Sequence, residues 1–278
     1  MATIEALRHA IEGDGAERVL TLDPAFQGLP DTAHGGSLLA VFDAVARRGG
    51  ARVIEGQYHR RVPLGVPLAL RIGEDGEARA FELAEAGAVL ARGRVSPGGG
   101  TGGPSPALPA PAAPALPVSR TCFACGTDNP LGLRLRLRAD DAAVGGTWTP
   151  RPGFTAFDGT LAPVALTTLL DEVAFWLGAL ATGESGMTTT LHVTLHRPVA
   201  AGTRLLVAGS RAEVRPRPGD PRYLHTSVVA LDEAGRPVAS AAITFVAVRG
   251  AARRLVAGLL AVNPPELLRR VFPGYARA

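Results

Sequence analysis

The sequence predicts an α+β fold that is built twice within one chain. Each half places runs of alternating apolar residues, typical of strands, before and after one apolar helix. This order fits an antiparallel sheet that covers a single helix. Segments of the first half recur in the second, and a segment rich in glycine and proline separates the two. We therefore expect two antiparallel sheets, each wrapping one central helix.

Four segments are expected along the chain. Residues 1–95 form an N-terminal domain, and residues 119–250 form a C-terminal domain. Residues 96–118 carry seven prolines and no charge, which predicts a linker between them. Residues 251–278 are expected to add two helices that pack on a sheet face or at a subunit contact.

The expected helices and strands are bounded by Gly, Asp and Pro. In the first half, a hairpin of residues 4–11 and 17–23 precedes a helix at residues 37–48. Strands are expected after it at residues 52–62, 67–72, 78–84 and 88–95. In the second half, strands at 133–138 and 144–148 precede a helix at 162–181, and strands follow at 188–195, 204–214, 224–231 and 238–248.

The two halves also match residue by residue. Residues 59–65 (HRRVPLG) resemble residues 196–202 (HRPVAAG), and residues 83–91 (LAEAGAVLA) resemble residues 231–239 (LDEAGRPVA). Both pairs occur in the same order relative to the helices. We infer an internal duplication.

Composition excludes several classes of function. Hydrophobic residues make up 46% of the 278 residues, which is typical of a globular chain. The 29 basic residues are all Arg and lie scattered, so we expect no nucleic-acid partner. No apolar run looks long enough to span a bilayer, and Glu5 and Arg8 interrupt the start where a signal peptide is apolar. We expect a cytoplasmic protein with no membrane partner.

The two cysteines, Cys122 and Cys125, form a Cys-x-x-Cys motif. This spacing is half of a zinc site, but the chain has no second pair and no histidine nearby at ligand spacing. Gly126 and Pro130 place the motif in a turn, whereas a redox pair usually begins a helix. We expect a structural turn, with metal binding or redox chemistry as the alternatives.

The stretch His34-Gly35-Gly36 precedes the first expected helix. Small residues at a helix start let another group approach the free backbone N–H donors, whose partial positive charge suits an oxyanion. A plain helix cap is the alternative interpretation.

Several short motifs occur in one order along the chain. They are Gln27-Gly28-Leu29-Pro30 with His34-Gly35-Gly36 and Asp43 in the first half, and residues 122–133 (CFACGTDNPLGL), Leu169-Leu170-Asp171-Glu172 and Thr188 in the second. Together they resemble the hotdog-fold thioesterase superfamily, in particular the phenylacetate-pathway and 4-hydroxybenzoyl-CoA thioesterase-like proteins. The resemblance covers nearly the whole chain as two hotdog units in tandem.

This resemblance implies hydrolysis of acyl-CoA thioesters without a metal or prosthetic group. Coenzyme A then enters only as part of the acyl-CoA substrate. A backbone N–H at a helix start polarises the thioester carbonyl, and an acidic residue on a helix is the base or nucleophile. A homodimer of the double unit is expected.

Helix geometry requires that two units share each site. Gly35 and Asp43 lie eight residues apart, about 12 Å along a helix, so they cannot act on one carbonyl. Aligning Asp171 with Asp43 places Pro163 at the position of Gly35, and proline has no N–H to donate. The first half thus keeps the carbonyl-binding loop and the second half keeps the acid.

One complete composite site is therefore predicted. It consists of Gln27, His34, Gly35 and Gly36 facing Asp171 and Thr188. The Gly35 N–H, helped by the Gln27 amide, is expected to polarise the carbonyl. Asp171, oriented by Thr188, is expected to activate water or attack, with Glu172 as a weaker substitute. His34 is expected to shape the loop.

Two other functions remain open at this point. A hydratase or dehydratase of acyl thioesters shares the fold, although Asp128-Asn129-Pro130 lacks the histidine that its motif needs. A non-catalytic acyl-CoA-binding or regulatory protein is the second alternative. The sequence does not indicate which acyl group is preferred, because Phe175 and Trp176 suit either an acyl pocket or the core. Arg60 and Arg61 suit either CoA phosphates or a solvated edge.

Overall fold

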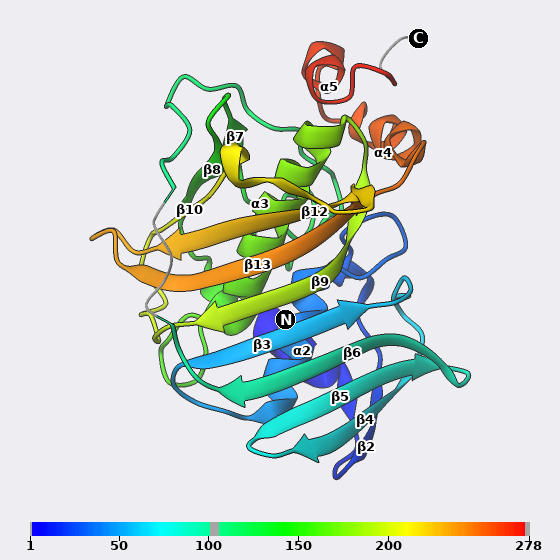
Figure 1. Ribbon diagram of the computed structural model, residues 1–278. Helices are drawn as coiled ribbons and strands as arrows, with labels where there is room; N and C mark the ends of the chain where they lie inside the picture. Colours follow the sequence, from blue (N-terminus) through cyan, green and yellow to red (C-terminus); the bar gives the residue numbers. More distant parts are fainter. Residues whose placement is uncertain (1, 101–105, 276–278) are drawn as a thin grey trace.

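The computed structural model describes residues 2–100 and 106–275 and contains two similar halves. In each half a long apolar helix lies against one face of an antiparallel sheet, α2 (Gly35–Ala46) in the first and α3 (Pro163–Thr182) in the second. Figure 1 shows the strands side by side across the front of the molecule, with α2 and α3 behind them. The α+β architecture expected from the sequence is confirmed.

The first half contains α1 (Thr3–His9), β1 (Ile11–Glu12), β2 (Glu17–Leu20), the 3-10 turn η1 (Pro24–Phe26), α2, β3 (Arg52–Tyr58), β4 (Leu68–Asp75), β5 (Ala78–Glu85) and β6 (Ala88–Pro97). The second half contains β7 (Arg138–Ala139), β8 (Ala143–Trp148), η2 (Pro152–Phe154), α3, β9 (Gly186–Leu195), β10 (Leu205–Ser210), η3 (Arg211–Glu213), β11 (Arg215–Arg217), β12 (Asp220–Leu231) and β13 (Pro237–Ala247). Two helices follow, α4 (Ala251–Leu259) and α5 (Pro265–Val271).

The two half-sheets are joined edge to edge into one continuous sheet. The strand order is β1-β2-β4-β5-β6-β3-β9-β13-β12-β10-β8-β7, and β11 pairs with β12. The junction is the antiparallel pair β3 and β9, whose register sets Arg52 opposite Leu195 and Gly56 opposite Leu191. Because β3 and β9 are each the first strand after a helix, this junction brings α2 and α3 side by side on one face.

Two local expectations were wrong. Residues 4–11 are mostly the helix α1, because Thr3, Ala6 and Leu7 bury one helical face and the Glu5 carboxylate accepts the Ala2 N–H at 2.9 Å. Only β1 and β2 remain of the expected hairpin. Of residues 133–138, only Arg138 lies in a strand, since Leu133 N–H bonds the Phe123 carbonyl of a loop instead of a neighbouring strand.

The expected linker also packs in part against the second half. Residues 101–105 of it lie outside the described residues. Beyond them, Ala113 and Leu116 are buried, and the Leu116 N–H donates to the Leu137 carbonyl at 2.9 Å. Apolar side chains in a proline-rich segment therefore fix its C-terminal part onto the domain.

The length of the apolar run that forms α3 was underestimated from the sequence. Its 20 residues are long and apolar enough, by length and composition alone, to cross a membrane. In this structure 83% of its apolar window is buried, and the helix packs against both the sheet and α2. Its hydrophobicity is explained by its position in the core.

Close packing of α2 on α3 depends on Gly36. A Cβ at this position would lie 2.5 Å from the Thr167 carbonyl oxygen and 2.6 Å from the Thr168 Cα, both backbone atoms. The Thr167 hydroxyl also donates to the Gly36 carbonyl at 2.7 Å. The glycine therefore allows the two helix backbones to touch, which fixes the distance between the halves where the candidate site lies.

We predict that Gly36→Ala lowers the free energy of unfolding by about 1–3 kcal/mol, because backbone atoms of α3 have to shift to admit the methyl group. Urea unfolding monitored by circular dichroism measures this change. Gly73→Ala is the matched control, since nothing lies within 4 Å of a Cβ at that position in β4. Equal midpoints for the two variants would contradict the packing described above.

Candidate functional site

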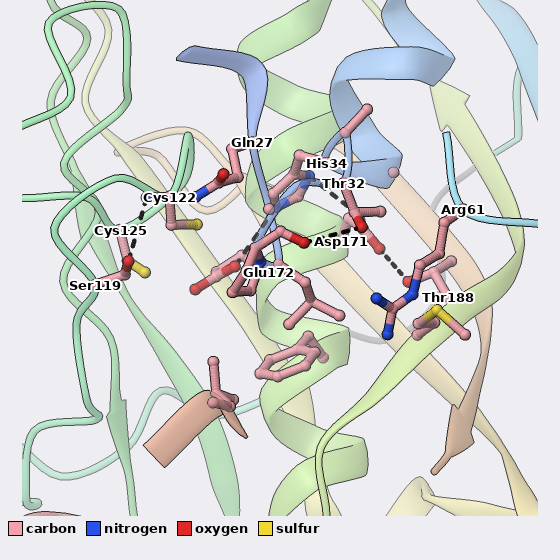
Figure 2. A pocket seen from close by; sticks show the side chains of 18 of the residues that line it. Gln27, Thr32, His34, Arg61, Ser119, Cys122, Cys125, Asp171, Glu172 and Thr188 are labelled. Atoms are coloured by element: carbon pink, nitrogen blue, oxygen red, sulfur yellow. Dashed lines mark hydrogen bonds and ion pairs between the residues drawn. The ribbon is translucent and has the colours of Figure 1, made fainter. Parts of the chain in front are cut away.

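A cluster of polar groups beside a cavity lies where the two halves meet. The cavity has a volume of about 220 Å³. Six segments line it: the loop that leads into α2 with the start of that helix, residues 58–62 at the end of β3, the loop of residues 117–125, the middle of α3, the start of β9, and α4. Figure 2 shows the labelled polar side chains around the cavity, with His34, Asp171 and Glu172 close together.

Asp171 is the centre of the polar cluster. It is buried in the middle of α3, with its carboxylate directed at the start of α2. Its Oδ2 accepts the Gly36 N–H at 2.9 Å, and its Oδ1 accepts the Thr188 hydroxyl of β9 at 2.6 Å. The structure therefore brings Asp171, Thr188 and Gly36 together, as the composite arrangement requires.

His34 completes this cluster as an ion-pair partner. Its Nδ1 lies 3.2 Å from Asp171 Oδ2, and its Nε2 lies 3.5 Å from Glu172 Oε2. Burial by itself lowers the pKa of His34, but the hydrogen bonds to Asp171 and Glu172 outweigh burial and hold that pKa well above 6.5. The two carboxylates thus favour the protonated form of His34. Its Nδ1 also lies 3.2 Å from the Gly36 nitrogen at the N-cap of α2, so His34 shapes the helix start as well.

The charge state of Asp171 follows from the same contacts. Burial raises the pKa of this carboxyl group, but the His34 hydrogen bond and charge, with the Thr188 and Gly36 donors, bring the net pKa below its ordinary 3.8. The carboxylate is held ionised in an apolar surrounding. Tyr58 lies close by, and burial and the Asp171 charge raise its pKa well above 10.

Gly35 is the first residue of α2 and lines the cavity. Its carbonyl accepts the Tyr58 hydroxyl at 2.8 Å, and a Cβ at this residue would lie 2.7 Å from Asp171 Oδ2. No acceptor within the described residues bonds the Gly35 N–H. A backbone donor at a helix start therefore lies beside the carboxylate without a protein partner, the arrangement that an oxyanion site needs.

Gln27 lies at the same cavity but does not contact Asp171. Its amide nitrogen donates to the Thr121 hydroxyl at 2.6 Å, and its amide oxygen accepts the Asp31 N–H at 3.2 Å. The side chain therefore ties the loop of the first half to the segment of residues 117–125.

The corresponding position in the other half is built differently. Asp43 is buried on α2, but both of its oxygens are bonded by the guanidinium of Arg52, with 2.8 Å between Arg52 Nη2 and Asp43 Oδ2. The helix that starts at Pro163 has no N–H at its first residue. Asp43 is thus paired with a guanidinium that binds both of its oxygens, whereas Asp171 is paired with His34 and also accepts a hydroxyl and a backbone N–H.

Some residues at the cavity were not expected from the sequence. Tyr58, Cys122, Cys125, Leu255, Gly258 and Leu259 line it, and Glu172 is tied down by the Trp176 indole N–H at 3.1 Å. The apolar face of α4 was visible in the sequence as an amphipathic pattern, but nothing there indicated which surface it covers. Phe175 and Trp176, which suited either an acyl pocket or the core, both line the cavity, and Trp176 also belongs to the buried core.

Comparison with solved structures places the arrangement in a known fold. A hot dog fold protein from Alicyclobacillus acidocaldarius matches with a TM-score of 0.59 at 14% identity over 88% of this chain and 97% of that one. An acyl-CoA thioesterase II, TesB2, from Mycobacterium marinum matches with a TM-score of 0.59 at 14% identity over 89% and 98%. The chain is a double hotdog.

A dehydratase, GphF, has the same fold, with a TM-score of 0.55 at 16% identity over 85% of this chain and 96% of that one. No protein-family model and no curated protein sequence matches this double hotdog. Because the matched structures are covered almost completely, both halves correspond to units of one fold. At these identities the likeness shows the fold alone.

We predict strong coupling between the two buried charges of this double hotdog. Asp171→Asn and His34→Gln should each lower stability by about 3–5 kcal/mol, since each leaves a buried group without its partner. The double variant should lose less stability than the two single variants added together, by about 0.5–3 kcal/mol. Urea unfolding of the four proteins measures this coupling.

The exposed pair His192 and Glu55, 3.1 Å apart, is the matched control for this cycle. Coupling there should stay below about 1 kcal/mol, as for other solvated pairs. Additive effects at His34 and Asp171 would contradict the buried ion pair.

Proposed function

We propose that this double hotdog hydrolyses acyl-CoA thioesters at a single composite site between its halves. The observation that carries the proposal is the contact between the Asp171 carboxylate of the second half and the glycine helix start of the first, 2.9 Å from the Gly36 N–H. An ionised carboxylate and a backbone donor without a protein partner face one cavity. These are the two groups that acyl transfer to water requires.

In this proposal the thioester carbonyl oxygen binds at the Gly35 N–H. The donor stabilises the negative charge that develops on the oxygen as the carbonyl is attacked. Asp171 takes a proton from the attacking water, the C–S bond breaks, and the proton passes to the coenzyme A thiolate. In the alternative route Asp171 attacks the carbonyl, the thiolate leaves, and water then cleaves the acyl–Asp171 anhydride to regenerate the carboxylate and protonate the thiolate. Thr188 and His34 hold the carboxylate in position through Oδ1 and Oδ2. The reaction needs no metal or prosthetic group.

The cavity offers different surfaces to the two parts of such a substrate. Phe175, Trp176 and Leu255 provide apolar surface for an acyl group. Arg60 and Arg61 are exposed at the cavity lining, where they suit the phosphates of coenzyme A. Acyl-CoA is therefore the proposed substrate class.

We predict that the purified protein releases thiol from at least one member of a panel of short, medium, long and aromatic acyl-CoAs. Asp171→Ala should lower the rate by about 10²–10⁴-fold, the typical contribution of a positioned acid or base. Asp43→Asn is the matched control and should retain the rate. Asp43 lies on α2, and the facing helix α3 begins with Pro163, which has no N–H to bind a carbonyl oxygen there. A thiol-release assay with each CoA measures both.

Full activity of a folded Asp171→Ala variant would overturn the mechanism. No hydrolysis by the wild-type protein, combined with tight acyl-CoA binding, would instead indicate the non-catalytic binding protein. Hydration of an unsaturated acyl-CoA would indicate the dehydratase class, which the similarity to GphF makes worth including in the panel.

A further inference from the structure

Three ligand-type side chains meet at the cavity on the side of His34 away from Asp171. A ring nitrogen of His34, the Cys122 sulfur and a Glu172 carboxylate oxygen all lie within 4.8 Å of one another, and all three residues are buried. Figure 2 shows these side chains arriving from three segments: the loop before α2, the loop of residues 117–125, and α3. The proposed hydrolysis uses neither Cys122 nor Glu172.

The ring nitrogen available to this cluster is Nε2. His34 Nδ1 lies against Asp171 Oδ2 at 3.2 Å, whereas Nε2 lies 3.5 Å from Glu172 Oε2. We propose that His34 Nε2, Cys122 Sγ and a Glu172 carboxylate oxygen bind a zinc ion, with the fourth position open to the cavity. Cys125 lines the same cavity and is the nearest further sulfur by sequence.

The donor set suits zinc better than other common cations. A thiolate, an imidazole and a carboxylate are all ligands that zinc accepts in tetrahedral sites, whereas magnesium and calcium prefer oxygen ligands only. Ligands around tetrahedral zinc lie about 3.3–3.8 Å apart, given bond lengths of ~2.0–2.3 Å. The three atoms therefore need to approach one another by at most about 1.5 Å, a shift on the scale of a side-chain rotation.

Outer contacts already orient two of the three ligands. His34 Nδ1 faces the Asp171 carboxylate, which is the carboxylate–histidine–metal arrangement found at many zinc sites. The other oxygen of Glu172, Oε1, accepts the Trp176 indole N–H at 3.1 Å. Both ligands are thus held with one donor atom directed toward Cys122.

The fold also supplies what the sequence motif lacks. The Cys-x-x-Cys motif has no histidine nearby in the chain, but the loop that carries it is fixed against the first half by the Phe123 N–H, which donates to the Gln27 carbonyl at 2.6 Å. This contact places Cys122 beside His34. Zinc binding there releases protons from Cys122 and from His34 Nε2 to solvent and transfers no electron.

Cobalt(II), a spectroscopic substitute for zinc, tests the proposal without any substrate. The full-length protein is treated with a chelator, dialysed under reducing conditions and titrated with cobalt chloride. We expect one cobalt bound per chain, with a near-ultraviolet thiolate-to-cobalt charge-transfer band that zinc chloride abolishes by displacement. Cys122→Ser should lose this band, and Glu172→Gln should weaken cobalt binding by ~10-fold or more.

His192→Gln is the control variant, because His192 is an exposed histidine paired with Glu55 away from the cavity, and its binding should match the wild type. Circular dichroism checks that each variant is folded. Absence of the charge-transfer band in the wild-type protein would overturn the proposal, as would a band that survives in Cys122→Ser. Since this readout needs no acyl-CoA, it stands or falls independently of the proposed hydrolysis.

Discussion

The contact between the start of α2 and the middle of α3 determines how this molecule is built. Gly36 lets the two backbones touch, and its N–H donates to a carboxylate that belongs to the other half. A buried carboxylate is costly unless charge and hydrogen bonds compensate it. Asp171 obtains both from His34, Thr188 and Gly36, so the ion cluster is stable only while the halves stay in register. The β3 and β9 junction keeps that register.

Each half carries one buried acid on its central helix, and the structure holds the two acids differently. Asp171 is held beside the cavity by His34, a hydroxyl and a backbone donor. Asp43 is held by the guanidinium of Arg52, which uses both carboxylate oxygens. Proline at the start of α3 removes the donor that Asp43 would need opposite it. A fused pair of units can lose one site in this way without losing the sheet junction that both units share.

Much of the fold was predictable because local sequence patterns indicate its helices, its strands and its repeat. The repeat between residues 59–65 and 196–202, together with the apolar helices, was enough for an α+β double unit. Residues 4–11 were predicted as a strand but are mostly helical. In so short an apolar run, the alternation of a strand cannot be told from one face of a helix until the residues that bury it are known. Leu133 to Leu137 alternate like a strand, but their backbone partners are loop residues.

The residues of the candidate site were predictable only where they belong to a recognisable sequence motif. Gly36, Asp171 and Thr188 meet as the spacing argument required, since a helix cannot place Gly35 and Asp43 on one carbonyl. The charged role of His34 and the position of Cys122 beside it depend on contacts between distant segments, which no spacing rule reports. The lining from α4 was hidden for the same reason: an amphipathic helix shows which face is buried but not against what.

The central claim is that one chain holds one composite site. Isothermal titration with an unhydrolysable acyl-CoA analogue, in which a methylene group replaces the thioester sulfur, tests it most directly. The structure predicts one analogue bound per chain, and Gly35→Val, whose side chain would enter the space of the Asp171 carboxylate, should abolish that binding. Two analogues per chain, or binding unaffected by Gly35→Val in a folded protein, would contradict the account.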